Sequence, residues 1–341
     1  MKIDSNVGGD ITAIGEDART AERDGYSGLW VGEAQHEPFL QCLQAANATE
    51  SAVIGTSIAI AFARTPMTLA NSAFDLNLYS KGRFVLGLGS QVKPHIERRF
   101  SMPWSHPAAR MRELIMAMRA IWACWQDGEK LDFQGDFYTH TLMTPFFAPK
   151  PHAYGPPPVY LAGVNERMTE VAGEVADGFF IHPFTTLRYI NEVTLPALRR
   201  GRAAAGKTDA DGVGSLDGYT LCGPSLVTVG RTEEELAKAA KGTKIQIAFY
   251  ASTPAYRSVL DMHGWGDLQP ELTRLSKAGK WGEMSKLIDD DMLREFSVVG
   301  APDEVAEGLA AKLGGVYDRM TFYTPYEMSS QILPMLIDKL R

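Results

Sequence analysis

The sequence predicts an α/β barrel, in which eight strand and helix units close a parallel sheet on itself. Short apolar runs alternate with helix-forming segments along most of the chain, a pattern typical of parallel strands covered by helices. The length of 341 residues fits one barrel domain over residues 1–341 that carries insertions. Hydrophobic residues make up 45% and charged residues 22%, so the chain can bury a large core without disulfides or a structural metal.

The first half of the chain alternates helix and strand patterns. We expect, in order, a helix at 11–24, a strand at 28–33, a strand at 53–60, a helix at 67–79 and a strand at 83–89. The strands are runs rich in β-branched and other apolar residues, such as VIGTSIAI. The helix at 67–79 places Leu69, Ala73 and Leu76 on one side, which is the spacing of a buried helix face.

The second half continues the alternation with two interruptions. We expect a helix at about 107–127 that begins at a proline, a strand at 159–162, a helix at 166–176, a strand ending at 182, and last strands near 227 and 321. Residues 131–144 alternate apolar and polar positions around a Gly-Asp turn and predict a hairpin insertion. Residues 243–291 are rich in aromatic residues, glycine and charge, and predict a lobe or lid over the barrel mouth.

Composition excludes several classes of protein. The formal net charge is -7 and no stretch concentrates Lys or Arg, so nucleic acid is a poor candidate partner. Met1 is followed by Lys2 and Asp4 rather than an apolar segment, and no later apolar run approaches the roughly 18 residues of a membrane span, so we expect a cytoplasmic protein. The three cysteines lie far apart and predict neither a disulfide framework nor a zinc cluster.

Candidate catalytic residues follow the predicted strands, where a parallel barrel has its active site. Glu33 ends an apolar strand, so its carboxylate is expected either to face the site or to form an ion pair. His36 is a candidate acid, base or hydrogen-bond donor, although a histidine in a loop is often a surface residue. A metal-dependent hydrolase would need more His and Asp residues at strand ends than the sequence supplies, so we predict no metal site.

Candidate cofactor-binding residues follow three other strands. The segment GLGSQ, with Gly89, Ser90 and Gln91, is either a phosphate loop or a tight strand exit. The segment AGVN, with Ala162, Gly163, Val164 and Asn165, precedes a helix and is the better anion site, because backbone amides and the helix dipole favour negative charge there. His182 either points into the pocket or fills the barrel rim. Aromatic residues of FFAPK and IQIAFYASTPAYR line an apolar cavity or belong to the core.

Four ordered motifs give the chain a resemblance to a known family. GLWVGE, GTSIAIAFARTP, GRFVLGLGSQ and VYLAGVNERMTEVAGEVADGF resemble, in this order, segments of the bacterial luciferase-like superfamily, particularly its branch of oxidoreductases dependent on coenzyme F420. The resemblance implies a luciferase-like TIM (β/α)8 barrel with insertions. It also implies a non-proline cis peptide at Ser57-Ile58 beneath the cofactor ring, Gly89 to Gln91 near the cofactor, and Gly163 to Asn165 near its phosphate.

The resemblance also implies a function. We expect an oxidoreductase that transfers a hydride between the deazaflavin F420 and a small alcohol, aldehyde, ketone or enone, with Glu33 or His36 managing a proton. Many F420 relatives carry an Asp-His pair at the second strand, whereas Ala34 follows Glu33 here, so the role of the histidine does not carry over by position. The alternatives are a monooxygenase that uses reduced FMN and oxygen, and a deazaflavin-binding protein without activity. Relatives commonly form dimers, so we expect a homodimer.

Overall fold

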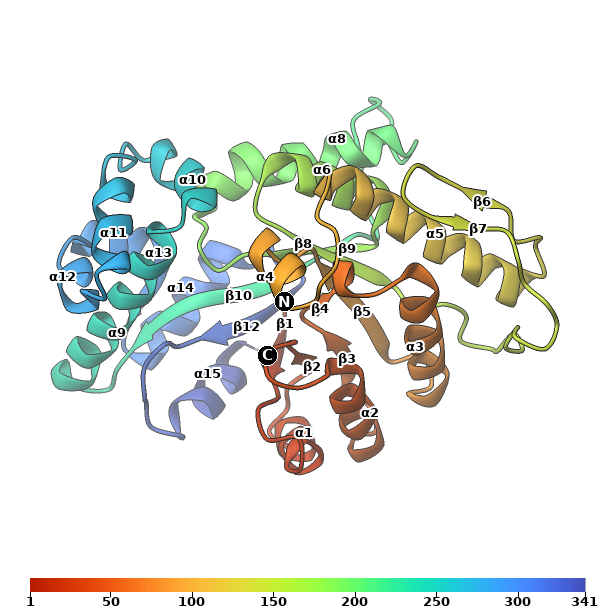
Figure 1. The fold of residues 1–341 in the computed structure, drawn as a ribbon. Coiled ribbons are helices and arrows are strands. Elements are labelled where there is room, and N and C mark those ends of the chain that lie inside the picture. Colours follow the sequence, from red (N-terminus) through yellow and green to blue (C-terminus); the bar gives the residue numbers. More distant parts are fainter. Residues whose placement is uncertain (341) are drawn as a thin grey trace.

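The computed structural model describes residues 1–340, which form a closed parallel barrel enclosed by helices (Figure 1). Neighbouring strands pair in sequence order, and β12 pairs with β1 to close the ring. The predicted barrel fold is therefore confirmed. Within residues 1–340 the ring consists, in order, of β1 (Lys2–Asn6), β2 (Gly28–Val31), β3 (Val53–Thr56), β5 (Phe84–Gly89), β8 (Val159–Gly163), β9 (Gly178–Ile181), β10 (Thr220–Val229) and β12 (Arg319–Tyr323).

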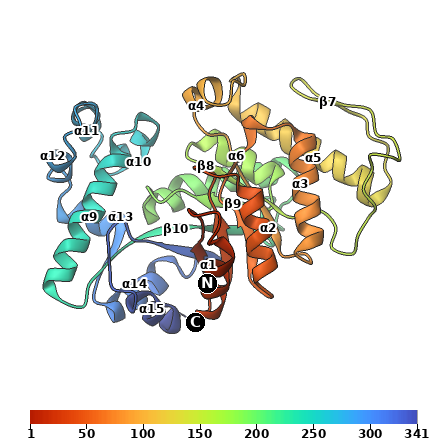
Figure 2. The same ribbon diagram turned by 60° about the horizontal axis from the view of Figure 1, so that its bottom comes forward.

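Helices cover the outside of the barrel, as Figures 1 and 2 show from two directions. They are α1 (Ile14–Arg23), α2 (Pro38–Ala48), α3 (Pro66–Tyr79), α5 (Pro107–Asp127), α6 (Glu166–Val175), α8 (Leu195–Ala204), α14 (Pro302–Leu313) and α15 (Ile332–Leu340). Short pieces between them are η1 (Ala61–Ala63), α4 (Lys93–Arg98), α7 (Leu187–Tyr189) and η2 (Ile190–Thr194). Within residues 1–340, none of the helices has both the length and the apolar character needed to cross a bilayer.

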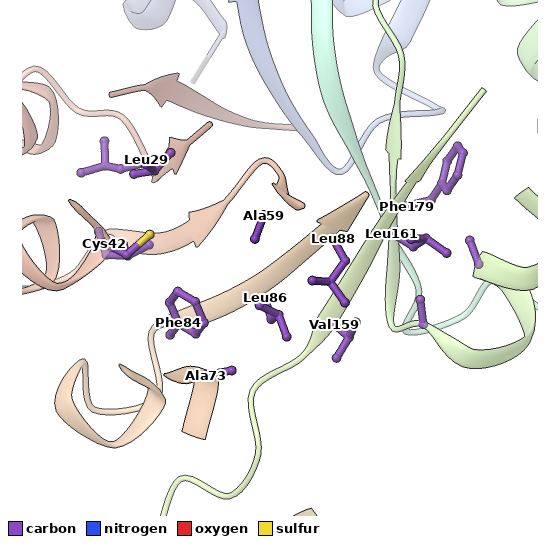
Figure 3. Packing of buried hydrophobic residues seen from close by; sticks show 14 of the residues in the cluster. Leu29, Cys42, Ala59, Ala73, Phe84, Leu86, Leu88, Val159, Leu161 and Phe179 are labelled. Carbon is purple, nitrogen blue, oxygen red and sulfur yellow. The ribbon is translucent and has the colours of Figure 1, made fainter. Parts of the chain in front are cut away.

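Alternation along the strands divides the buried side chains into two layers. On β5, Phe84, Leu86 and Leu88 point outwards and pack towards Ala73 of α3 and the neighbouring strands (Figure 3). The residues between them point inwards, where Val85 joins an interior cluster with Trp30, Tyr160, Phe180 and Cys222. The barrel interior is therefore filled by side chains below its mouth.

β1 was not predicted, because its sequence KIDSN does not read as an apolar strand. The structure buries Asp4 completely and pairs it with Arg319 of β12, whose Nη2 and Nε donate to the two carboxylate oxygens at 2.7 and 2.8 Å. Trp30 Nε1 donates to the same carboxylate at 2.9 Å. Burial, the largest effect, raises the pKa of Asp4, and Arg319 opposes that shift. Asp4, whose polarity is the reason that β1 was not predicted, therefore connects the first and last strands of the barrel.

The predicted strand at 53–60 is divided by a bulge. Gly55 pairs with Val85 and Ala59 with Leu88, so four steps along one strand match three along β5, and β4 (Ala59–Ile60) follows β3 as a separate strand. The peptide bond between Ser57 and Ile58 is cis, as the resemblance implied. Helix α2 was also not predicted, although its sequence carries Glu37 as an N-cap and Pro38 in its first turn.

Two additions extend the barrel at opposite sides in Figure 1. An antiparallel ribbon of β6 (Phe133–Gln134) and β7 (Thr139–His140) lies beside α5, within the range predicted as a hairpin. A helical lobe between β10 and β11 (Ser297–Gly300) packs around a second buried cluster, which Phe184, Tyr189 and Leu226 from outside the lobe also join. It consists of α9 (Glu233–Ala251), η3 (Pro254–Tyr256), α10 (Arg257–Met262), α11 (Leu268–Lys277), α12 (Trp281–Ser285) and α13 (Asp290–Phe296). The predicted bounds of 243–291 begin inside α9 and end inside α13.

Arg319→Met is expected to lower the free energy of unfolding by about 3–5 kcal/mol, because it leaves the Asp4 carboxylate buried without its cation. The double variant Asp4→Asn/Arg319→Met is expected to be more stable than this single variant. Urea unfolding at pH 7 measures both. As a control, Arg274→Met removes an exposed ion pair with Glu271 and should cost no more than about 1 kcal/mol. A double variant no more stable than Arg319→Met would contradict this reading of the ion pair.

Candidate active site

A cavity of about 440 Å³ lies at the carboxyl ends of the barrel strands. Its wall contains all the residues that were predicted to bind a cofactor: Ser57, Ile58, Gly89, Ser90, Gln91, Ala162, Gly163, Val164, Asn165 and His182. The barrel thus brings together four segments that are separated in the sequence. The size is within the roughly 300–1,000 Å³ of small-molecule sites.

Close packing at the bulge explains why glycine stands at position 89. A Cβ atom there would lie 2.8 Å from Ile58 Cγ1, closer than nonbonded carbon atoms approach. The missing side chain lets β5 approach the bulge, and the cavity wall includes both residues. Gln91, two residues later, has a φ of 59° and turns the chain away from the strand end.

Glu33 supports the bulge from the other side. Its carboxylate accepts hydrogen bonds from the backbone N–H of Ile60 at 2.7 Å and from Arg64 Nη1 at 2.6 Å, and the side chain is only 7% exposed. Arg64 Nη2 also donates to Glu37 at 2.9 Å. Of the two alternatives for Glu33, the structure therefore places it in an ion pair, and it is not in the wall of the 440 Å³ cavity.

Two other predicted candidates also lie elsewhere. His36 is in the loop between β2 and α2, near Asp10, and does not line this cavity. Phe146 and Phe147 of FFAPK are 88% and 70% exposed, so they line neither an apolar cavity nor the core. Local sequence indicated an apolar role for the two phenylalanines, but the loop that carries them lies on the surface.

The turn from β8 into α6 offers hydrogen-bond donors to an anion. Asn165 is the N-cap residue, and its side chain accepts from the backbone N–H of Met168 at 2.9 Å. The backbone N–H groups at the start of the helix have no partner inside the helix and, with its dipole, favour a negative charge. Glu166, in the first turn, forms an ion pair with Arg200. The residues of this turn therefore fit a phosphate group.

His182 connects the barrel to the helical lobe. Its Nδ1 accepts from the backbone N–H of Phe184 at 3.1 Å, so the ring hydrogen is on Nε2, which lies 3.1 Å from the hydroxyl of Tyr256. Burial lowers the pKa of His182 to about 4, so the ring is neutral at neutral pH. His182 then donates to Tyr256, whose own hydroxyl hydrogen remains available to a molecule in the cavity.

Tyr256 was not singled out from the sequence. It belongs to the aromatic segment IQIAFYASTPAYR, for which a cavity and a core position were both open, and it reaches the cavity from η3 of the lobe. Burial raises the pKa of its hydroxyl, which therefore stays protonated near neutral pH. The aromatic segment was the signal in the sequence for a residue such as Tyr256. Nothing in that segment indicated that Tyr256 contacts His182.

A second cavity of about 310 Å³ adjoins the first at the barrel mouth. The two share Ser57, Phe180, Pro183 and Pro224 in their walls, so molecules bound in them would lie side by side. Within residues 1–340, no group of three or more His, Cys, Asp or Glu side chains is arranged to hold a metal ion. The arrangement suits one larger and one smaller organic molecule held in contact.

Comparison of sequences gives one family and several relatives. The family model described as luciferase-like monooxygenase matches residues 2–318. An uncharacterized protein of Mycobacterium tuberculosis is 51% identical over 320 residues, which cover 94% of this chain and 92% of that protein. A 5,10-methylenetetrahydromethanopterin reductase of Archaeoglobus fulgidus is 25% identical over 297 residues, 85% of this chain and 82% of the reductase.

Comparison of structures gives the same fold. The coenzyme F420 dependent tetrahydromethanopterin reductase from Methanopyrus kandleri superposes with a TM-score of 0.78 at 19% identity, covering 100% of this chain and 99% of that one. The EDTA monooxygenase from Chelativorans sp. BNC1 superposes with a TM-score of 0.71 at 16% identity, covering 100% and 92%. At these identities the likeness concerns the fold.

The low pKa of His182 predicts a pH dependence of stability. Between about pH 6.5 and pH 4 the unfolded chain binds a proton that folded His182 does not, so this contribution to stability is full above pH 6.5 and is lost as the pH falls. In His182→Asn, the loss of unfolding free energy between pH 7 and pH 5 should shrink by about 1–2 kcal/mol, measured by urea unfolding. His95→Asn, which removes an exposed histidine, is the matched control. Equal pH dependence in His182→Asn and the natural chain would contradict the assignment of a neutral ring.

Proposed function

The chain belongs to the luciferase-like monooxygenase family, and on this premise we propose that it is an oxidoreductase that binds the deazaflavin coenzyme F420 and exchanges a hydride with a small organic substrate. The observation that carries the proposal is the 440 Å³ cavity, whose wall combines the bulge at Ser57-Ile58, the Gly89 loop and the start of α6. A relative that is 24% identical, the F420-dependent glucose-6-phosphate dehydrogenase of Amycolatopsis mediterranei, supports the choice of cofactor.

The residues present fit a ring system with a phosphate-bearing tail. Apolar side chains of Ile58, Phe180 and Ile181 provide surface for a ring, while the turn at 163–165 provides backbone donors for a phosphate. The wall contains no Asp or Glu in the described chain, so no carboxylate in it would repel an anionic cofactor. FMN shares these features, which makes a monooxygenase that uses reduced FMN and oxygen the second candidate. The description of the family model and the fold of the EDTA monooxygenase favour that alternative.

When bound, either cofactor supplies two-electron chemistry at its ring. The chain contributes position and a hydrogen-bond donor: the helical lobe supplies Tyr256 to the cavity wall, and the hydroxyl of Tyr256, oriented by His182, can donate to a bound molecule. Glu33 acts as a positioning residue, because its carboxylate holds Ile60 and Arg64 next to the bulge. His36, outside both cavity walls, remains the other candidate for handling a proton if its loop moves towards the mouth.

The substrate class of the proposal is a small alcohol, aldehyde, ketone or enone, and the assembly is a homodimer in the cytoplasm. A deazaflavin-binding protein without turnover is a minor alternative. It would bind F420 with no hydride transfer to any carbonyl or alcohol offered. Its only support in the sequence is Ala34, which stands where many F420 relatives have a histidine.

Titration of the purified protein with F420 and, separately, with FMN tests the proposal. We expect quenching of F420 fluorescence with saturation, and binding of FMN that is at least about tenfold weaker, a difference of about 1.4 kcal/mol. Tighter binding of FMN, followed by oxygen consumption with reduced FMN, would move the assignment to the monooxygenase. Binding of neither molecule would contradict both.

The phosphate site has a separate test at Asn165. Asn165→Asp preserves an N-cap acceptor but adds negative charge, so it should weaken F420 binding by about tenfold, whereas the neutral cap in Asn165→Ser should change it little. A deazaflavin that lacks the phosphate tail should bind all three proteins equally. Equal weakening of both deazaflavins by Asn165→Asp would show that this turn does not hold the phosphate.

A further inference from the structure

The second cavity, at the barrel mouth, has a floor and rim of aromatic side chains. Trp30 and Phe180 lie at its base, 5.2 Å apart between ring centroids and perpendicular to each other. Tyr250 from α9 and Tyr323 from β12 form its upper wall. Aromatic walls favour flat ring compounds, because edge and face contacts add to the burial of apolar surface.

The charge of this wall is already balanced within the protein. Arg319 is the one cationic side chain in the wall among residues 1–340, and its guanidinium is paired at 2.7 and 2.8 Å with the buried carboxylate of Asp4. An anionic ligand would have to compete with Asp4 or remain unpaired in a largely apolar space, and either costs binding energy. The wall therefore disfavours carboxylates and phosphates.

The hydroxyl groups of Tyr250 and Tyr323 form a pair in the wall that can bind a ligand. The hydroxyl oxygens of Tyr250 and Tyr323 are 3.2 Å apart, so one donates to the other. Tyr250 also has a hydrogen bond with the Gln246 side chain that acts to lower the pKa of Tyr250, so the Gln246 amide is the donor in it. Whichever tyrosine donates to the other, the hydrogen of its partner is then used in neither bond. A neutral oxygen acceptor such as a carbonyl would complete the arrangement.

The volume limits the size of the molecule. A cavity of about 150 Å³ holds benzene, and this one has about 310 Å³, which is room for one ring with substituents or two rings. The four wall residues shared with the larger cavity would keep such a molecule in contact with the proposed cofactor.

From these observations we propose that the barrel-mouth cavity binds a neutral aromatic carbonyl compound or the corresponding alcohol, with its oxygen at the hydroxyl pair of Tyr250 and Tyr323. The inference that this compound is the substrate rests on the proposed function. Binding in this cavity, however, can be measured without turnover.

The experiment compares two probes of similar shape, 4-methylacetophenone and 4-acetylbenzoate, by equilibrium dialysis against the full chain, first alone and then saturated with F420. We expect the neutral ketone to bind at least about tenfold more tightly than the carboxylate. Equal or tighter binding of the carboxylate, or binding of neither probe, overturns the inference. The F420 titration is read separately, so failure of the cofactor to bind rejects the proposed function without deciding the probe result.

Variants of the cavity wall test whether the ketone binds in this cavity. Tyr250→Phe/Tyr323→Phe removes both hydroxyl groups, since a single variant would leave one donor, and should weaken binding of 4-methylacetophenone about three- to tenfold. Tyr79→Phe, which removes an exposed hydroxyl on α3 that bonds to Asn47, is the matched control and should leave binding unchanged. Unchanged binding to the double variant, with a melting temperature near that of the natural chain, would show that the ketone binds elsewhere.

Discussion

Closure of the parallel barrel is the constraint on which the other features depend. Because β12 pairs with β1 and β9 pairs with β10, each strand of the ring has two parallel neighbours. Their carboxyl ends therefore meet at one mouth. Segments as far apart as residues 57 and 256 can then form one cavity wall, and each segment needs only a small number of residues at a strand end or in a loop.

Sequence patterns identified the parts of the site that are local. Ser90 and Gln91 directly follow β5, and the segment 162–165 ends β8 and leads into α6, so their place at the mouth could be predicted from alternation alone. Contacts between distant segments could not be predicted in this way. Arg64 meets Glu33 across the bulge, and Tyr256 meets His182 from a lobe whose bounds the sequence indicated only approximately. The strand β1 was hidden for the same reason, since the polarity of Asp4 makes sense only with its partner in view.

An acidic residue at a strand end can face the active site or form an ion pair, and Glu33 forms an ion pair. The Glu33 carboxylate accepts from a guanidinium and a backbone amide, so its hydrogen bonds are used to hold the bulge in place. The neutral pair of His182 and Tyr256 has the opposite character, because a hydroxyl hydrogen remains unassigned within the protein. The mouth therefore combines a rigid side, built by the bulge, with a side supplied by the lobe.

The ion pair between Asp4 and Arg319 also bears on how the protein is made. The two residues are 315 positions apart. At about 5–20 residues per second, a ribosome adds Arg319 roughly 15–60 s after Asp4. Throughout that interval the nascent chain carries an unclosed sheet, whose first strand has one unpaired edge and a carboxylate without its cation. Barrel closure therefore has to wait until Arg319 has been made, and the growing chain has to avoid wrong strand pairing until then.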